Sequence, residues 1–368
     1  MSSALKLPFR TGGLLLSSNH FLSPLEGVSC VGFRALCHKN GAALTFTEMI
    51  RAQAINRNNS ATLDLIDTYD ENTPTGIQLL AKSASELKTA LLRLSSLSND
   101  PQWYHFKNIC AIDLNLGCPS PDVIREGAGP SLLKRKKVLS EMFEVMVEFK
   151  SMKENLGVKA VGCKIRLGLN SLEESHKVYL RVVEAANDAG LDWITVHARN
   201  ARMRSSDQPH WDAIREVVDT VDGLSTTQNN TRNKILVIGN GDVKCLSSRS
   251  ELYDASRCDG FMVARAAIRN PWIFNDFNKT DNSINKVSES SWPTLEQVDH
   301  ATNEYSNMAI KYKTKSKFVS YHEKNFARLR KSVETGNAIW LFSRQIRFIL
   351  RRYLFVFIGL CCCRVNVC

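Results

Sequence analysis

The feature of this 368-residue sequence that most constrains its fold is a series of eight short apolar or β-rich runs. Segments of helix length separate most of them, and the one containing ESHKVYLRVVEAANDAG ends in Gly190, a residue that commonly terminates helices. Runs this short, bounded by Gly and Pro, are typical of buried parallel strands. The runs cover residues 20–27, 43–49, 75–81, 111–118, 161–168, 193–199, 234–241 and 260–265.

This alternation predicts an α/β fold of the TIM barrel class. Eight strand–helix units in about 250 residues is the count of a (β/α)8 barrel. A doubly wound sheet is the competing fold, but it normally shows a glycine-rich phosphate loop after its first strand. The first run here shows only SPLEG. We therefore expect the barrel over residues 20–275.

The first 19 residues allow two interpretations. Their two basic residues, several serines and lack of acidic residues would suit a transit peptide. The alternative is a β-hairpin in which KLPFR and LLLSS flank a turn at Gly12–Gly13. We favour the hairpin, as a cap over residues 1–19, because Gly-Gly is a turn signal and arginine is scarce.

Three further segments follow the barrel. Residues 276–292 are polar and read as a linker, and 293–357 have a helical pattern. Twelve Lys or Arg and three Asp or Glu lie between 301 and 352, so this region holds +9 of the total charge of +11. Charge this concentrated favours a nucleic-acid partner over a merely solvated surface. For the cysteine-rich tail at 358–368, lipidation, metal binding and an irregular terminus remain open; we favour the last.

The cysteines and the hydropathy pattern narrow the cellular compartment that we expect for this protein. The eleven cysteines are odd in number and show no paired C-x-x-C spacing, which argues against a disulfide framework and a zinc module. No apolar run reaches the roughly 18–20 residues needed to span a bilayer. We expect a monomeric cytoplasmic protein without a metal ion and without membrane contact.

Chemically active residues cluster where the expected strands end. Active sites of TIM barrels form at the C-terminal ends of the strands. A lone strand cysteine is usually a small hydrophobe and a lone histidine is usually structural, but an unpaired buried ammonium such as that of Lys164 is costly and needs a partner. The convergence of many such residues on one rim is the stronger signal. The residues are Gln78, Asn115, Cys118, Lys164, Arg166, His197, Arg199, Asn240, Gly241, Asp242, Ala264 and Arg265.

Over about residues 20–275 the sequence resembles the flavin-dependent tRNA-dihydrouridine synthases. GCP followed by GAG-x-x-L, with KIRLG, NGD and NPW, forms a specific signature. The C-terminal helical region resembles the tRNA-binding domain of that family more weakly. The matching stretches, in family order, are SPLEGVSCVGFR, TFTEM, IQLLA, DLNLGCPSP with GAGPSLLKR, CKIRLG, ITVHARNAR, VIGNGDV and CDGFMVARAAIRNPWIF.

The resemblance implies an FMN site across the barrel mouth. Ser23, Pro24 and Leu25 would line it from the first strand. Gln78 and Lys164 would contact the isoalloxazine ring. The residues that would hold the ring edge, ribityl chain and phosphate are His197, Asn240, Gly241, Asp242, Ala264 and Arg265.

It also implies a reaction. FMN reduced by NADPH would give a hydride from N5 to C6 of a tRNA uridine, while the Cys118 thiol gives a proton to C5 and Asn115 positions the base. Such a thiol, with a pKa near about 8.5, carries its proton at neutral pH. The expected tRNA-binding residues are Arg199, Arg202, Lys324, Arg328, Arg330 and Lys331.

Two other functions compete with this one. An FMN-dependent barrel could reduce a free pyrimidine or another small molecule, but it would not need the basic helical region. A non-catalytic RNA-binding relative would be expected to have lost Cys118 or Lys164, and both are present.

Overall fold

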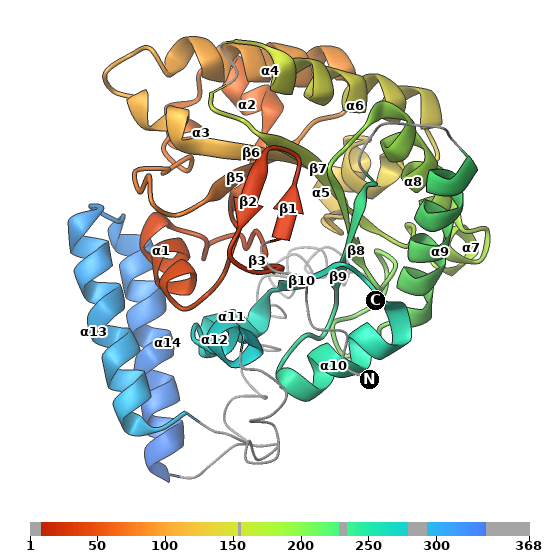
Figure 1. The fold of residues 1–368 in the computed structure, drawn as a ribbon. Coiled ribbons are helices and arrows are strands. Elements are labelled where there is room, and N and C mark those ends of the chain that lie inside the picture. The colour runs from red at the N-terminus through yellow and green to blue at the C-terminus, as the bar shows by residue number, and fades with distance from the viewer. Residues whose placement is uncertain (1–8, 154–155, 228–233, 279–292, 336–368) are drawn as a thin grey trace, which may run out of the picture.

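The computed structural model describes residues 9–153, 156–227, 234–278 and 293–335, and their centre is a closed parallel barrel (Figure 1). Neighbouring strands pair in the order β3-β10-β9-β8-β7-β6-β5-β4, and a parallel bridge between Phe21 and Leu44 joins β3 to the β4 end. Each expected run overlaps one strand, which confirms the TIM barrel. The strands are β3 (His20–Leu22), β4 (Thr45–Arg51), β5 (Thr75–Leu80), β6 (Ile109–Leu116), β7 (Ala160–Arg166), β8 (Trp193–His197), β9 (Leu236–Asn240) and β10 (Gly260–Val263).

Helices surround this barrel and bury their apolar faces against the outside of the strands (Figure 1). In α4 (Ala84–Leu97), Ser83 caps the first turn and the buried residues recur at helical spacing. The other helices of the ring are α1 (Val31–Lys39), α2 (Ala52–Asn56), α3 (Ser60–Leu63), α5 (Pro121–Arg125), α6 (Lys136–Ser151), α7 (Ser171–Ser175), α8 (Val178–Ala189), α9 (Trp211–Thr227), α10 (Leu246–Ser256), α11 (Arg265–Arg269) and α12 (Ile273–Asn278), with 3-10 turns η1 (Tyr104–Asn108) and η2 (Gly129–Leu132).

Aromatic rings fill the lower half of the barrel interior. Phe21, Phe46 and Trp193 pack against one another with centroids 6.2–6.4 Å apart. Gly162 makes room for them, since a Cβ added there would lie 2.2 Å from the Trp193 ring. This apolar floor leaves the polar inward-facing residues at the C-terminal ends of the strands.

The N-terminal segment forms a hairpin of β1 (Phe9–Thr11) and β2 (Leu14–Leu16), which pair antiparallel. Gly12 takes φ +55° at the turn, and the Gly13 N–H donates to Lys159 O at 2.8 Å. Leu14 and Leu16 join the same apolar cluster as the floor rings. The hairpin therefore covers the N-terminal end of the barrel; residues 1–8 lie outside the described ranges.

Two long helices, α13 (Leu295–Lys311) and α14 (Ser316–Thr335), lie against α1 at the side of the barrel (Figure 1). The His322 ring stacks on Phe33 at 4.5 Å, and its Nε2 lies 3.0 Å from Val28 O in the loop after β3. The Phe33 and His322 rings are both fully buried, so α14 packs closely against the barrel. No helix in the described ranges is long and apolar enough to cross a membrane.

Segment boundaries differ from expectation at one point. Helix α12 continues through Asn278, beyond the expected barrel end at 275, because Ile273, Phe274 and Phe277 are buried in the main core. The rest of the expected linker, the third helical stretch at 337–357 and the tail at 358–368 lie outside the described residues.

Candidate active site

Strand register brings the predicted site residues together. Asn115 on β6 lies beside Lys164 on β7, and Arg166 lies beside His197, which lies beside Asn240 on β9. Because side chains alternate along a strand, residues in register with one another share one face of the sheet. These residues therefore form a polar layer above the aromatic floor.

Beneath this layer runs a chain of buried hydrogen bonds that sequence reasoning missed. Trp193 Nε1 donates to Asp113 Oδ1 at 3.3 Å, and Gln78 Nε2 donates to Asp113 Oδ2 at 2.7 Å. Asn115 Nδ2 donates to Gln78 Oε1 at 2.8 Å. Gln78, which was predicted to contact the isoalloxazine ring, also links Asp113 to Asn115 through its amide. The signal for Asp113 was a carboxylate in an apolar strand, on the same face as Asn115.

Cys118 lies at the loop that leaves β6. Asn115 Oδ1 accepts hydrogen bonds from the N–H groups of Gly117 at 3.1 Å and Cys118 at 2.9 Å. Arg166 Nε donates to Gly117 O at 3.0 Å. The half-buried thiol packs beside Leu80, and burial raises its pKa. Cys118 therefore carries a protonated thiol at neutral pH, on a backbone that hydrogen bonds hold in place.

Lys164 and His197 have strongly altered acidity. Burial, followed by the charge of Arg166, lowers the pKa of Lys164 to about 8, while Asp113 opposes this shift. The Lys164 ammonium makes no hydrogen bond within the described part of the chain. Burial and the surrounding cations, Lys164 foremost, hold the pKa of His197 well below its usual value. At neutral pH the imidazole is neutral and the ammonium is largely charged.

An ion cluster lies at the ends of β9 and β10. Asp242 follows Gly241, which takes φ +122°, and its carboxylate accepts from Arg199 Nη2 at 2.7 Å and Arg265 Nη2 at 3.1 Å. Arg199 is only 1% exposed and also donates to Asp207 O. Arg199 was predicted as a phosphate contact on the loop after β8; in the structure it is buried, and Asp242 supplies its counter-charge.

The remaining predicted residues frame the mouth. Ser23 is buried, with its N–H bonded to Val263 O at 2.8 Å, while Pro24 and Leu25 are half-exposed at the rim. Asn240 Nδ2 donates to Met262 O at 2.8 Å, which ties β9 to β10. Ala264 is the N-cap residue that precedes α11.

Donor chemistry at the mouth fits an anionic, carbonyl-bearing group such as FMN. The cations Lys164, Arg166, Arg199 and Arg265 all act on His197, so their charges converge on one region. Asp242 offsets part of that charge, and Arg265 remains 48% exposed. The Lys164 ammonium can accommodate a ring carbonyl, and the exposed guanidinium of Arg265 can accommodate a phosphate.

The predicted RNA-binding cations lie elsewhere on the surface. Arg202 is exposed on the loop after β8. Lys324, Arg328 and Lys331 are exposed on α14 at spacings that place them on one face. Arg330 lies on another face, paired with Asp299 at 3.0 Å and Glu334 at 3.5 Å.

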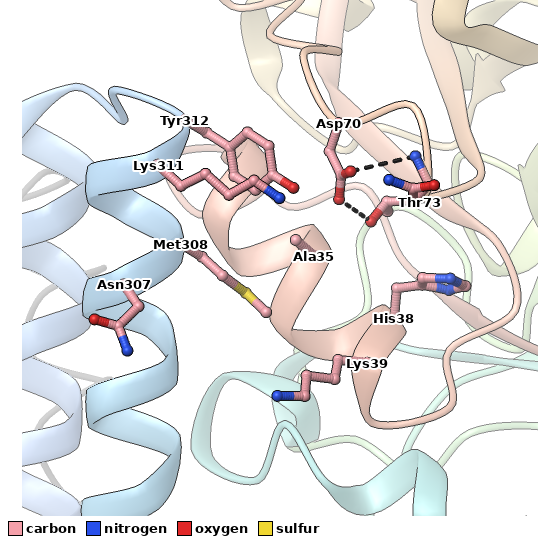
Figure 2. A pocket seen from close by; sticks show the side chains of 10 residues that line it. Ala35, His38, Lys39, Asp70, Thr73, Asn307, Met308, Lys311 and Tyr312 are labelled. Atoms are coloured by element: carbon pink, nitrogen blue, oxygen red, sulfur yellow. Dashed lines mark hydrogen bonds between the residues drawn. The ribbon is translucent and has the colours of Figure 1, made fainter.

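A separate pocket of about 420 Å³ lies between α1 and α13 and is away from all of the predicted site residues (Figure 2). Asp70 Oδ2 accepts there from Thr73 Oγ1 at 2.6 Å. It is lined by Ala35, His38, Lys39, Asp70, Asn72, Thr73, Asn307, Met308, Lys311 and Tyr312.

The fold and the site together define a TIM-barrel enzyme. Its mouth carries several cationic side chains and the Cys118 thiol, whose loop is fixed by hydrogen bonds. Residues 21–340 match the family model described as "Dihydrouridine synthase (Dus)". The chain belongs to this dihydrouridine synthase family and is an oxidoreductase.

Curated relatives match over most of their length. A "Probable tRNA-dihydrouridine synthase" of Aquifex aeolicus is 29% identical over 298 residues, which cover 81% of this chain and 84% of the relative. A protein of the same name from Treponema pallidum is 27% identical over 326 residues, covering 86% and 88%. These relatives agree with the family assignment.

Among solved structures, histamine dehydrogenase from Rhizobium sp. 4-9 superposes with a TM-score of 0.53 at 11% identity. The match covers 83% of this chain and 51% of that one, so this chain spans about half of the neighbour's length. The likeness supports the barrel fold.

Proposed function

We propose that this chain reduces specific uridines of tRNA to 5,6-dihydrouridine. The observation that carries the proposal is the Cys118 loop, which is held by Asn115 and Arg166 at the barrel mouth beside Lys164. The family assignment and the names of the relatives support tRNA uridine as the substrate.

The mouth would hold FMN. Lys164 would face the ring, neutral His197 and Gly241 the ring edge and ribityl chain, and Arg265 the phosphate, with Asp242 released or rearranged around it. When bound, FMN supplies the hydride for uracil C6, with NADPH as its reductant. Pro24 and Leu25 at the rim would cover the ring and exclude water.

Cys118 would supply the proton. Reduction of the C5=C6 bond needs a hydride at C6 and a proton at C5, and the Cys118 S–H bond breaks to give the latter. Burial raises the thiol's pKa, so the proton is present at neutral pH. Because the side chain is only half-buried, the resulting thiolate can regain a proton from solvent. Asn115 holds the backbone that aims this thiol.

The tRNA would lie across the mouth and along α14. Lys317 acts electrostatically on Glu48 in the barrel, and Tyr321 and Arg269 act on each other, so this face of α14 borders the mouth. Lys324, Arg328 and Lys331 continue the same face. We propose them and Arg202 as phosphate contacts, and Arg199 as an internal support. Base extrusion toward the mouth would cost a few kcal/mol, which such contacts can offset.

A reducing cytoplasmic location belongs to the same proposal. All seven cysteines in the described ranges are free. A monomeric state stays a prediction.

The alternative is reduction of a free pyrimidine by the same mouth, and one experiment separates the two. Purified protein with FMN and NADPH is given unmodified tRNA transcript, uridine or uracil. We expect dihydrouridine in the transcript and little turnover of the free compounds. Turnover of free uridine or uracil with no product in tRNA would contradict the proposal.

A further inference from the structure

We propose that Asp113 is a positioning residue: it sets the direction of the buried hydrogen-bond chain and thereby holds the Cys118 loop in register. The chain runs from the barrel floor to the loop through Trp193, Asp113, Gln78 and Asn115. The effect of Asp113 on catalysis rests on the proposed function, whereas its role in holding the Cys118 loop does not.

Both ends of the chain are fixed donors. At the floor the donor is the indole N–H of Trp193. At the loop the donors are the backbone N–H groups of Gly117 and Cys118, which both need an acceptor. An indole nitrogen and a peptide nitrogen cannot exchange roles with an acceptor. A series of hydrogen bonds with donors at both ends must therefore contain one group that accepts from both of its neighbours.

The two amides between those ends can each be turned over. A side-chain amide presents an oxygen on one side and an NH2 on the other, so Gln78 and Asn115 could point either way. An ionised carboxylate only accepts. Asp113 therefore requires the Gln78 NH2 to face it, which turns Gln78 Oε1 to Asn115, which turns Asn115 Oδ1 to the loop. Every observed bond has this direction.

Burial leaves the chain no substitute partner. Asp113 and Trp193 are 0% exposed, and Gln78 is 1% exposed. Trp193 is packed between the rings of Phe21 and Phe46, so it cannot turn away from its acceptor. The loop is the weaker end, because Cys118 is half-exposed. A conflict anywhere in the chain is therefore expected to appear at the loop.

Asp113→Asn tests the direction directly. The oxygen of the new amide stays on the Trp193 N–H, so its NH2 faces Gln78. The Gln78 amide must then turn over, and so must the Asn115 amide. As a result, the N–H groups of Gly117 and Cys118 face another NH2 instead of an oxygen. The expected result is at least a tenfold loss of exchange protection at these two amides, measured by hydrogen exchange on the full-length protein, and faster alkylation of Cys118, measured by peptide mass spectrometry.

Trp193→Phe supplies the matched rescue. Without the indole donor, an asparagine at position 113 is free to turn its oxygen to Gln78, and the original direction returns. We expect Trp193→Phe alone to leave the loop near wild type. We expect Asp113→Asn/Trp193→Phe to restore protection to within about threefold of Trp193→Phe alone. The double variant also lacks the carboxylate, so rescue cannot come from restored charge beside Lys164.

A second pair keeps the test decisive if Asp113→Asn does not fold. Asp113→Asn/Asn115→Asp moves the carboxylate to the loop end, where it accepts from both backbone N–H groups and from Gln78, while asparagine accepts from Trp193 and donates to Gln78. This variant is expected to fold with protected loop amides. Catalytic rate is not its readout, because Asn115 belongs to the proposed site.

The outcomes are distinct. Unchanged protection in Asp113→Asn, or double variants no better protected than Asp113→Asn, would overturn the inference. Rescue of protection as described supports it. If the wild-type protein shows the predicted protection pattern but makes no dihydrouridine in tRNA, the proposed function fails while the role of Asp113 in holding the loop stands.

Discussion

The barrel mouth and the outer face of α14 use charge in opposite ways. At and just beneath the mouth, Arg199 and Asp113 are at most 1% exposed and each has several fixed partners. On α14, Lys324 and Arg328 are exposed, and Lys331 on the same face carries the same positive charge. Buried charges must be paired in one geometry, whereas exposed charges act through a screened field. The mouth should therefore tolerate little change, and α14 should tolerate graded change.

The largest expected effect is at the thiol. Cys118→Ala removes the proposed proton donor without touching the cations or α14. Turnover on tRNA should fall by about 10²–10⁴-fold, the usual range for a general acid. FMN content and tRNA affinity should stay near wild type, as measured by flavin absorbance and filter binding. Cys245→Ser, at an exposed thiol that caps α10, is the control and should keep full activity.

The next effect is at Lys164. Lys164→Ala should weaken FMN binding by about 10–100-fold, since a hydrogen bond to a charged group contributes about 1.5–3 kcal/mol. Flavin titration of the apoprotein measures this. Lys159→Ala is the matched control, because Lys159 precedes the same strand at the opposite end of the barrel and is exposed. Equal flavin affinity in both variants would remove Lys164 from the site.

The pH dependence of that binding sharpens the same point. Burial lowers the Lys164 pKa from 10.5 to about 8, so the ammonium loses its charge as pH rises through about 8. The titratable groups that act on it are Arg166, Asp113 and, once its thiol ionises at higher pH, Cys118. FMN affinity should fall across this range, and Lys164→Ala should flatten the profile. In the apoprotein the depressed pKa means that charged Lys164 opposes folding, so stability falls as pH drops from 10.5 to about 8 and is constant with respect to this group below that.

Smaller effects are expected on α14. Lys324→Ala/Arg328→Ala should weaken tRNA binding and lower the slope of log affinity against log salt by about 1 per residue, while turnover at saturating tRNA stays near wild type. Binding measured over a salt series reports this. Arg181→Ala, an exposed cation on α8, is the control. A loss of turnover at saturating tRNA would show that α14 acts in catalysis.

The smallest effect is expected at Arg330. Its guanidinium already pairs with Asp299 and Glu334, so it has less to offer a phosphate than Arg328. Arg330→Ala should change tRNA affinity less than Arg328→Ala in the same assay. The reverse order would mean that tRNA meets the other face of α14.

The sequence predicts the strands well because their short apolar runs and Gly or Pro boundaries are local signals. It also places Lys164 and His197 at strand ends, and parallel register then brings them near one another. Residue pairings that depend on distant segments could not be read this way. Gln78 and Asp113 lie opposite each other on the neighbouring strands β5 and β6, and Arg199 is buried because Asp242 arrives on a later loop. The local signal for Asp113 was a carboxylate in an apolar strand, which does not name its partner, and nothing near Arg199 signals Asp242.

The most direct test of the account maps dihydrouridine in tRNA, position by position, in cells that lack this gene and carry back either the wild-type gene or Cys118→Ala. Deletion should remove the modification at one or two positions, and only the wild type should restore it. If no position loses the modification on deletion, or if Cys118→Ala restores it, the claim that this chain reduces tRNA uridine with Cys118 as the proton donor is contradicted.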